Sequence, residues 1–573
     1  MKLNKILLTA GFITMCGSLV FAQDFGDFGD FGDSSDSFGG DDSFGGGSAS
    51  SKVELSGNVE TEIRAYTDAD APEKIEMGVT PAANLNLKYA GNKSDVELNL
   101  KVDENTIKKH PADVIDEAVL RGYFNTLTLE AGKMKVVWGK GDKLHVFDNF
   151  NSDDYSDFII PDYLDRRVST PMIRGIVSLP VANLNIEGIY TPLLPTDLFA
   201  TDGRWTPAQV TGLTQGVTAI AKESVSASVR RLEKARMEAT TAKNLQAAGN
   251  TAQLSSLVQQ AIADGKISNY TTQEIIAYCT AHSMDPTNSA NQVAAATAIL
   301  SQRYSNYIEK ELTDANTAYT LALTNASSLS SDSSVIYPDM KTLKYGQFGG
   351  RATWTLGQVD MGVSYYNGWY KQPSVNGDKL NAFVAKWLAN GTVTEEDKFL
   401  SYDKKQTFGV EASSVLWHFN IRGEFAYNLT EDTGGTNPWV HNNSIGWLGG
   451  FDIDLPFANA NLNVQEIGTY VLHGGNCNKN KADVDYGANG YTNNKIAANL
   501  TTSFMNDKIA PEVTVMYGIE NKDLVVMPKL SYKADQNLSF TASGMIIQCY
   551  DDNSEFKSWK KNSFVSLSAK YQF

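Results

Sequence analysis

The last ten residues, 564–573, constrain the fold more than any other stretch. They alternate strictly between apolar and polar side chains, which predicts a β-strand with one apolar and one polar face. Because chain ends fray unless a neighbour holds them, a strand that runs to the last residue needs a partner. A closed barrel supplies one, since its last strand pairs with its first; a half-buried edge strand is the alternative. The apolar face holds Val565, Leu567, Ala569, Tyr571 and Phe573.

This segment resembles the C-terminal signal of bacterial outer-membrane β-barrels, which ends in Phe with apolar residues at every second position before it. The resemblance implies recognition by the barrel-assembly machinery, with Phe573, Tyr571 and Leu567 as the assembly signal. It also implies a barrel surrounded by outer-membrane lipid, with aromatic side chains at the boundary between membrane and water.

The other end of the chain predicts export. Residues 1–22 have the pattern of a signal peptide, with Lys2 and Lys5 before an apolar core and Ala22 before the cut. No later stretch approaches the roughly 18 consecutive apolar residues of a membrane helix. An exported chain without such a helix can enter a membrane only as a barrel, because lipid offers no partner to open backbone groups.

Low sequence complexity sets residues 23–51 apart. Asp-Phe-Gly triplets and runs of Ser, Gly and Asp predict a disordered tether on the periplasmic side, because such a segment buries too little apolar area to offset its ordering entropy. The net charge of −17 argues against a nucleic-acid partner. Three cysteines follow the signal segment, and whether Cys477 and Cys549 form a disulfide stays open.

From Lys52 onward the alternation recurs. Val59 and Ile63 share one face of the first segment, while Glu60, Glu62 and Arg64 share the other, as expected between lipid and a wet lumen. Tight turns alternate with longer connections, and two periplasmic chain ends require an even strand number. The sequence therefore predicts an all-β transmembrane antiparallel barrel of about 16–18 strands, formed by residues 52–205 and 336–573.

Residues 206–335 interrupt this pattern. They are rich in Ala, Ser, Thr and Gln, and their apolar residues recur at helical spacing. This predicts two long amphipathic helices with shorter ones near 251–264 and 271–282. The strand count places this large α-helical insertion outside the cell. A packed cap, a lid, a partner-binding surface and a helical stem are the interpretations it leaves open.

The loop at 138–170 carries opposite charges next to aromatic residues. Its length allows it either to fold into the barrel or to stand out into solvent. Folded inward, it would narrow the pore and select small polar solutes; folded outward, its salt bridges would stabilise little. Calcium held by Asp153, Asp154 and Asp157 is a third interpretation, although EF-hand spacing is absent. The expected pore residues are Arg166, Arg167, Asp153, Asp154, Lys140 and Lys143.

A second resemblance covers most of residues 52–573. Trp138-Gly139 ends a segment before an Asn- and Asp-rich loop and an Arg pair, and Gly188-Ile189-Tyr190-Thr191-Pro192 follows downstream. Together they are similar to porin-like large outer-membrane barrels, including uncharacterised spirochaetal ones. The resemblance implies a bacterial outer-membrane protein with surface loops and a periplasmic N-terminus.

Three functions follow as expectations. The first is a porin or substrate-selective diffusion channel for small solutes. The others are a surface adhesin or antigen that displays the insertion, and a transporter of hydrophobic solutes such as fatty acids. Enzyme activity is not expected, since neither His-Glu-x-x-His nor Gly-x-Ser-x-Gly occurs. We expect no cofactor or metal, and leave assembly into a homo-oligomer open.

Overall fold

The computed structural model describes residues 52–68, 74–108, 111–331, 335–474, 491–551 and 554–573. The predicted signal peptide, the predicted tether and Cys477 lie outside the described residues. The chain divides into two compact units. One contains the residues up to Leu213 together with Pro338–Gly377 and Leu400–Phe573, and the other contains Thr214–Tyr337 and Asp378–Phe399.

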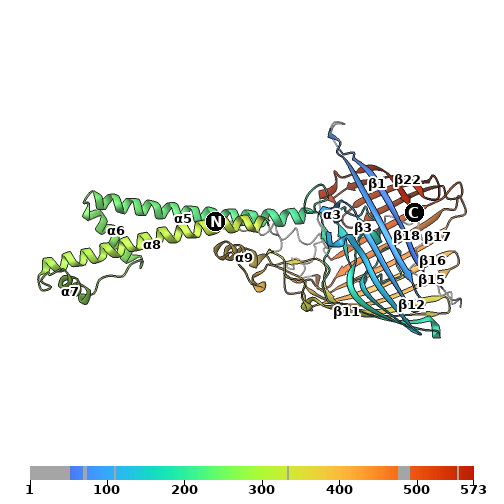
Figure 1. Cartoon of the computed structure of the whole chain (residues 1–573), viewed down its shortest axis with the longest axis horizontal. Helices are drawn as coiled ribbons and strands as arrows, with labels where there is room; N and C mark the ends of the chain where they lie inside the picture. The colour runs from blue at the N-terminus through green and yellow to red at the C-terminus, as the bar shows by residue number, and fades with distance from the viewer. Residues whose placement is uncertain (1–51, 69–73, 109–110, 332–334, 475–490, 552–553) are drawn as a thin grey trace. The chain divides into compact units, whose positions relative to one another are not determined.

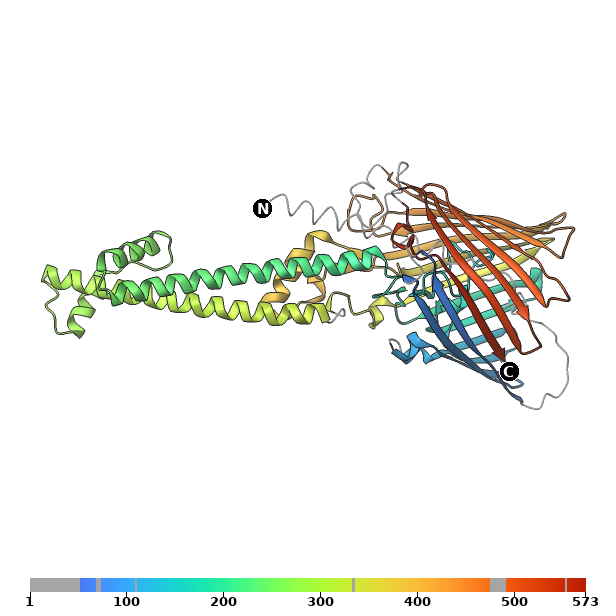
Figure 2. The same cartoon turned by 90° about the horizontal axis from the view of Figure 1, so that it is seen from above.

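The first unit is a closed antiparallel barrel of 18 strands, each paired with the next along the chain (Figures 1 and 2). The last strand pairs with the first, which confirms the predicted fold class and strand number. The strands are β1 (Lys52–Tyr66), β2 (Met77–Ala90), β3 (Ser94–Val102), β4 (Ile115–Phe124), β5 (Leu127–Met134), β8 (Thr170–Leu179), β9 (Leu184–Thr191), β11 (Gln347–Leu356), β12 (Val359–Trp369), β15 (Lys404–Leu416), β16 (Phe419–Thr430), β17 (Ser444–Asp454), β18 (Asn461–Val471), β19 (Thr492–Thr501), β20 (Ile509–Gly518), β21 (Asp523–Lys533), β22 (Leu538–Cys549) and β23 (Phe564–Gln572).

The two faces of the wall differ as the alternation predicts. On the β1–β23 pair, Val59 lies opposite Tyr571 and Ile63 opposite Leu567, and these four side chains are at least 45% exposed on the outer face. Arg64, one position along from Ile63, points inward and is 7% exposed. On this pair of strands the outer face is therefore apolar, and β1 presents a charged side chain to the interior.

The two ends of the barrel carry different connections. Short turns join the strands at the end where the chain enters β1 and leaves β23, as at 357–358 between β11 and β12. The connections at the opposite end are long, except for 519–522 between β20 and β21. They include 135–169, which we call the inner loop, and 192–346, which contains the helical insertion.

Short elements lie within the long connections. Within the inner loop, β6 (Ser152–Tyr155) pairs with β7 (Arg167–Val168), and β10 (Leu198–Phe199), from the connection after β9, pairs with β6 in parallel. The other short elements of the long connections are α3 (Glu104–Lys108), η3 (Pro111–Val114), α4 (Tyr163–Arg166), η6 (Leu343–Tyr345), β13 (Ser374–Val375), η7 (Glu395–Asp397), β14 (Leu400–Ser401) and η9 (Lys557–Trp559), while η4 (Val181–Asn183) lies in the short turn between β8 and β9.

The second unit is helical. Its elements are α5 (Ala208–Ala247, beginning in the first unit), α6 (Thr251–Ala263), α7 (Thr272–Ala281), α8 (Ser289–Ser331) and α9 (Gly377–Asn390). Figures 1 and 2 show α5 and α8 side by side as a long antiparallel hairpin, with α6 and α7 between them in the chain. No helix among the described residues is long and apolar enough to cross a bilayer.

Packing explains why these helices form. Buried Ala and aliphatic side chains of α5, α6 and α8 share one cluster that includes Ala239, Val258 and Leu300. The turn before α7 holds a capping box between Thr271 and Glu274. We did not predict α9, because its 14 residues lie in a connection between two strands. It is fixed to α8 by hydrogen bonds from Trp387 and Asn325.

Candidate functional site

The inner loop lies inside the barrel. It leaves β5 and returns at β8, yet its residues bond inward-facing side chains of strands far around the wall. Arg64 of β1 holds it on one side, while Glu424 of β16 and Gln465 of β18 hold it on the other. The loop therefore crosses the lumen, and its inward folding follows from these attachments.

Glu424 anchors the tip of the loop. Its carboxylate accepts the backbone N–H groups of Lys140 at 2.7 Å, Gly141 at 2.6 Å and Val146 at 3.0 Å, and Nδ1 of His145 lies 3.0 Å away. The side chain is buried, so these charge-assisted bonds replace its hydration. One carboxylate on the wall thus fixes the backbone of a whole turn.

Further contacts tighten the same turn. The amide of Gln465 accepts the N–H of Asp142 at 3.0 Å and donates to its carbonyl at 2.8 Å, and Asn463 donates to its carboxylate at 2.9 Å. Gly139 has φ +135°, and a Cβ there would lie 2.3 Å from Oε1 of Glu424. The turn therefore requires glycine next to the anchor.

The opposite side of the loop is held by a bidentate ion pair. Arg64 of β1 donates from Nη1 and Nη2 to the two carboxylate oxygens of Asp157, at 2.7 and 3.0 Å. Lys101 of β3 donates to the carbonyl of Asp165 at 3.2 Å. With Glu424, these contacts fasten the loop at widely separated points, so it cannot swing out of the lumen without breaking several charged contacts.

Apolar packing supports the loop from within. Phe158 stacks on Trp205 with ring centroids 5.0 Å apart, and Phe556 and Trp559 contact its other edges. Near the start of the loop, Trp138 meets Phe150 edge-on. The rings of Phe158, Trp205, Phe556 and Trp559 cover an apolar patch on the inner wall formed by Leu448, Ile467, Ala497, Met516, Val525, Met545, Ile547 and Phe564.

Arg166 and Arg167 correct part of the sequence interpretation. Their exposed fractions are 2% and 4%, so neither guanidinium presents its charge to an aqueous pore. Arg167 pairs with Asp148 at 2.8 Å and donates to Tyr163 Oη and the Val136 carbonyl. Arg166 donates to backbone carbonyls of the loop, including that of Pro161. The physical reason is that the loop folds around both arginines, which provide donors where its carbonyls are shielded from water.

The other predicted pore residues are half-buried. Lys143 pairs with Asp162 at 3.1 Å. Asp154 pairs through its backbone with Leu198 of β10, and its carboxylate accepts the N–H of Ser156. Lys140 contributes its backbone to the Glu424 anchor. The structure therefore brings these residues together in the loop, where Lys140, Lys143 and Asp154 retain partial exposure.

A buried polar cluster joins the inner loop to two other connections. Asp197 accepts the N–H of Asp153 at 3.2 Å and the side-chain amide of Gln372 at 3.1 Å. Burial, reinforced by the nearby Asp153 carboxylate, raises the pKa of Asp197 to about 7. Burial lowers the pKa of Lys371 to about 7; its ammonium donates to Gln347 at 2.8 Å. The cluster therefore changes protonation near neutral pH.

On the inner wall, charged side chains of alternating sign form a series from β3 to β15. We call this series the ion-pair belt. Each charged side chain of the belt is buried or half-buried beside one of the opposite sign. The belt therefore produces little net electric field in the lumen. Its pairs are Glu97 with Arg121 at 2.7 Å, Arg121 with Glu130 at 3.0 Å, Glu130 with Arg174 at 3.1 Å, Arg174 with Glu187 at 2.7 Å, and Arg351 with Glu411 at 2.6 Å.

One Ser–His–Asp group occurs among the connections. Ser374 Oγ lies 3.2 Å from Nδ1 of His441, and Asp403 Oδ2 lies 2.7 Å from the same nitrogen. A nucleophilic triad needs Ser and Asp on different imidazole nitrogens, so this geometry does not activate the serine. Across the described ranges, no group of three or more His, Cys, Asp or Glu residues could hold a metal ion.

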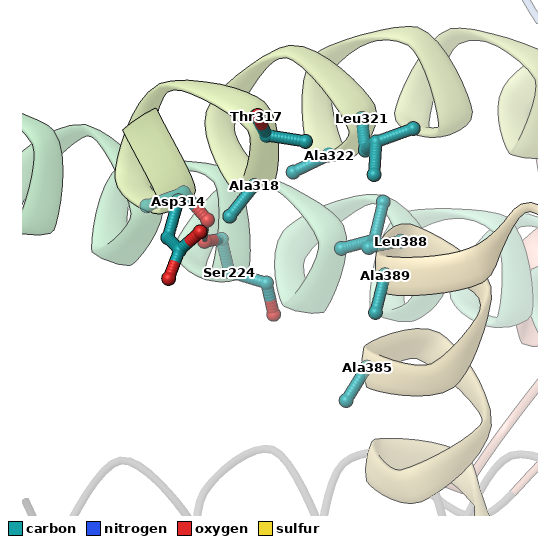
Figure 3. A pocket seen from close by; sticks show the side chains of 10 residues that line it. Ser224, Asp314, Thr317, Ala318, Leu321, Ala322, Ala385, Leu388 and Ala389 are labelled. Atoms are coloured by element: carbon teal, nitrogen blue, oxygen red, sulfur yellow. Dashed lines mark hydrogen bonds between the residues drawn. The ribbon is translucent and has the colours of Figure 1, made fainter. Parts of the chain in front are cut away.

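The helical unit contains a hollow of about 370 Å³ (Figure 3). Alanine side chains form much of its wall, with hydroxyls and one carboxylate at one edge. It results from small residues on three helices that meet without filling the space between them. Its lining residues are Ser224, Ser228, Asp314, Thr317, Ala318, Leu321, Ala322, Ala385, Leu388 and Ala389.

Sequence reasoning missed the wall residues that position the loop. Glu424, Arg64 and Gln465 lie within strands, where a single polar residue looks like any other inward-facing position. A usable signal was the inward-facing carboxylates Glu411 and Glu424, which lie directly opposite each other on β15 and β16. Two like charges in register need outside partners, and Arg351 and the loop backbone provide them.

Comparisons with known proteins add only a general likeness. No family model and no curated protein matches the sequence. Similar solved structures include a BenF-like porin from Pseudomonas fluorescens Pf-5 (8% identity, 91% of this chain and 98% of that chain, TM-score 0.39). Others are Acinetobacter baumannii OccAB4 (9%, 91% and 98%, 0.38) and Pseudomonas aeruginosa OpdQ (6%, 91% and 97%, 0.37).

Proposed function

We propose that this protein is an outer-membrane porin or substrate-selective diffusion channel for small polar solutes, with the inner loop as its constriction. The observation that carries the proposal is the loop itself, which crosses the lumen and is fastened by Glu424 on one side and Arg64 on the other. A closed barrel of this strand number is wide enough for an aqueous channel. A loop held across the lumen narrows the channel and does not have to close it.

The wall supports a membrane setting. Apolar side chains face outward along β1 and β23, and charged residues face inward. We place the chain ends in the periplasm and the long connections, including the helical insertion, outside the cell. Lipid of a bacterial outer membrane is then the partner of the outer wall. No catalytic activity is part of the proposal.

The selective charges of the constriction remain a proposal. Lys140, Lys143, Asp153 and Asp154 are our candidates, because they lie in the loop that narrows the lumen. Arg166 and Arg167 act by positioning that loop rather than by facing solutes. Phe573, Tyr571 and Leu567 are proposed as the signal read by the barrel-assembly machinery, since all three lie exposed on the outer face. Likeness to spirochaetal barrels and assembly into a homo-oligomer stay predictions.

The helical hairpin supports a second candidate, a surface adhesin or antigen whose barrel displays α5 to α8. The third candidate, a transporter of hydrophobic solutes, fits the geometry less well, because the ion-pair belt gives the lumen a polar lining.

Single-channel recording in planar bilayers separates these functions. We expect the purified full chain to conduct, and a variant lacking 206–335 to conduct equally or better. A barrel that never conducts, with or without the insertion, would leave display as the function. Heat-modifiable gel mobility should confirm beforehand that both proteins are folded.

A further inference from the structure

The inner wall of the barrel is covered unevenly by the inward-folded connections. On β16 to β23 they bury the inward side chains, including Glu424, Gln465, Lys495, Thr514 and Ser566, all at 5% exposure or less. On β2 and β3, by contrast, no described residue is buried. The connections therefore press against one arc of the wall. On β1 to β3 the inner loop is held at Arg64 and Lys101, near the ends that carry the long connections, and the inward side chains nearer the short turns stay partly exposed.

This partly exposed part of the wall carries a row of side-chain amides, which we call the amide wall: Asn58, Asn84, Asn86 and Asn99. Asn58 lies opposite Asn84 in the β1–β2 register, and Asn86 lies opposite Asn99 in the β2–β3 register. The amide of Asn84 donates to Asn58 at 3.3 Å, and Asn86 donates to Asn99. Asn99 donates in turn to Glu117 of β4 at 2.9 Å.

Each amide has two donor hydrogens and an acceptor oxygen. The hydrogen bonds along the amide wall use part of this capacity, and all four side chains are half-exposed. The unused donors and acceptors therefore stand in a fixed row that faces the lumen.

Charges near the amide wall are balanced. Glu97 pairs with Arg121, Lys101 lies 3.8 Å from Asp103, and Lys88 lies opposite Glu54 in the strand register. Pores that select ions by charge use rings of one sign, whereas this arc of the described wall carries both signs, with Glu60 and Glu62 next to Arg64 on β1. Balanced charge gives neither anions nor cations an advantage.

We infer that the amide wall is the solute path of the channel and that it takes uncharged, polyhydroxylated solutes of the sugar class. This inference rests on the proposed channel function and deepens it. Hydroxyl groups exchange hydrogen bonds with amides as both donors and acceptors, so such a solute replaces the water on the wall at little cost. An apolar solute would displace that water without replacing its hydrogen bonds to the amides.

Cysteine accessibility tests the path. In a full-length background with Cys279, Cys477 and Cys549 changed to Ser, we introduce Asn86→Cys or Thr80→Cys, the latter at an exposed inward-facing position of β2. The matched control is Ser566→Cys, which also faces inward but is 5% exposed. A cationic methanethiosulfonate reagent should lower the conductance of the first two variants about twofold or more and leave the control unchanged, because only a group beside the path obstructs flow.

Solute flux tests the class. Proteoliposomes should pass glucose at least about threefold faster than gluconate or glucosamine, which share its carbon frame but carry charge. Asn86→Asp together with Asn99→Asp should raise the glucosamine rate relative to glucose. Equal rates for the three solutes in the unmodified protein, or a faster charged solute, would overturn the sugar class.

The outcomes separate this inference from the channel function. Absence of conductance would remove the channel function and the path with it. A conducting protein that is blocked at Ser566→Cys, or at neither Asn86→Cys nor Thr80→Cys, would leave the channel in place and refute the amide wall as its path. Two test positions guard against a variant that fails to fold, which gel mobility would reveal.

Discussion

Gly57 and Phe573 exchange two backbone hydrogen bonds, at 3.0 and 2.9 Å, and so close the barrel at its end. The ring of Phe573 occupies the space beside Gly57, where a Cβ would lie 2.8 Å from Cζ of that ring and 2.6 Å from the carbonyl oxygen of Asn84. The terminal aromatic and the glycine are therefore complementary. The strand that ends the chain is held at its last residue, which prevents fraying.

Gly57→Val should weaken this closure. The added side chain must displace Phe573 or the β2 backbone, at a cost of about 1–3 kcal/mol. We expect a lower unfolding temperature in heat-modifiable gel shifts. Gly188→Val is the control, because its Cβ would meet no atom within 4 Å. An equal loss of unfolding temperature in both variants would show that any glycine in a strand is needed, and that the contact between Gly57 and Phe573 is not the cause.

Phe573→Ser should reduce assembly more than stability. The side chain is 51% exposed, so its loss removes little packing, whereas the assembly signal loses its terminal aromatic. We expect less folded protein in outer-membrane fractions and a near-normal melting temperature after refolding in detergent. Phe573→Tyr should retain assembly. Unchanged membrane levels for Phe573→Ser would count against the assembly-signal role.

Glu424→Gln should loosen the constriction. The neutral amide weakens the charge-assisted bonds from three backbone N–H groups, each worth about 1.5–3 kcal/mol in a charged pair. The tip of the inner loop then leaves the wall more often, which should raise single-channel conductance and current noise. Asp360→Asn removes another inward-facing carboxylate without touching the loop and should change neither. Matching traces for the two variants would contradict Glu424 as the anchor.

Arg167→Met should destabilise the protein without tuning its selectivity. Removing the guanidinium leaves the buried Asp148 carboxylate with the Tyr163 hydroxyl but without its counter-charge, at a cost of about 3–5 kcal/mol. Thermal melts should therefore show a large loss, partly recovered when Asp148→Leu is added. Lys143→Met, at a half-exposed pair, should melt nearly as the parent does. If Arg167→Met instead melted normally and favoured cations, the guanidinium would have to face the pore.

Asp197→Asn should flatten the pH dependence of stability. The pKa of Asp197 is raised to about 7, so between its ordinary value and 7 the folded state keeps a proton that the unfolded chain releases. This contribution to stability is thus fully present below the ordinary carboxyl pKa, falls as the pH rises toward 7 and levels off above 7. The amide that Asp197→Asn introduces does not titrate, so it adds no pH-dependent loss of stability. Its nitrogen can donate to the buried Oε1 of Gln372 after a side-chain flip.

Melting temperatures from pH 5 to 8 measure this effect. The parent should lose thermal stability from pH 5 to about 7, and Asp197→Asn should lose less over that interval and exceed the parent near pH 7. Asp154→Asn, in the neighbouring strand of the same small sheet, is the control and should follow the parent. Parallel curves for the parent and Asp197→Asn would show that this carboxyl does not link proton binding to folding.

Local patterns determined the barrel and the helices. Side chains alternate along Val565 to Phe573 and along Val53 to Arg64 because a strand has period two and separates lipid from lumen. The same reasoning predicted the helices at 251–264 and 271–282, since apolar residues at helical spacing need no knowledge of distant segments.

Only the tertiary structure decided what fills the lumen. The pair between Arg64 and Asp157, and the anchor of Glu424 on Gly141, join residues far apart in the chain, and no local pattern encodes such a meeting. The sequence indicated a charged inner loop but could not tell that Arg166 and Arg167 are enclosed by it, because burial depends on which segments fold over a side chain. Loop closure has no periodicity, whereas strand pairing does, so the wall was predictable and its constriction was not.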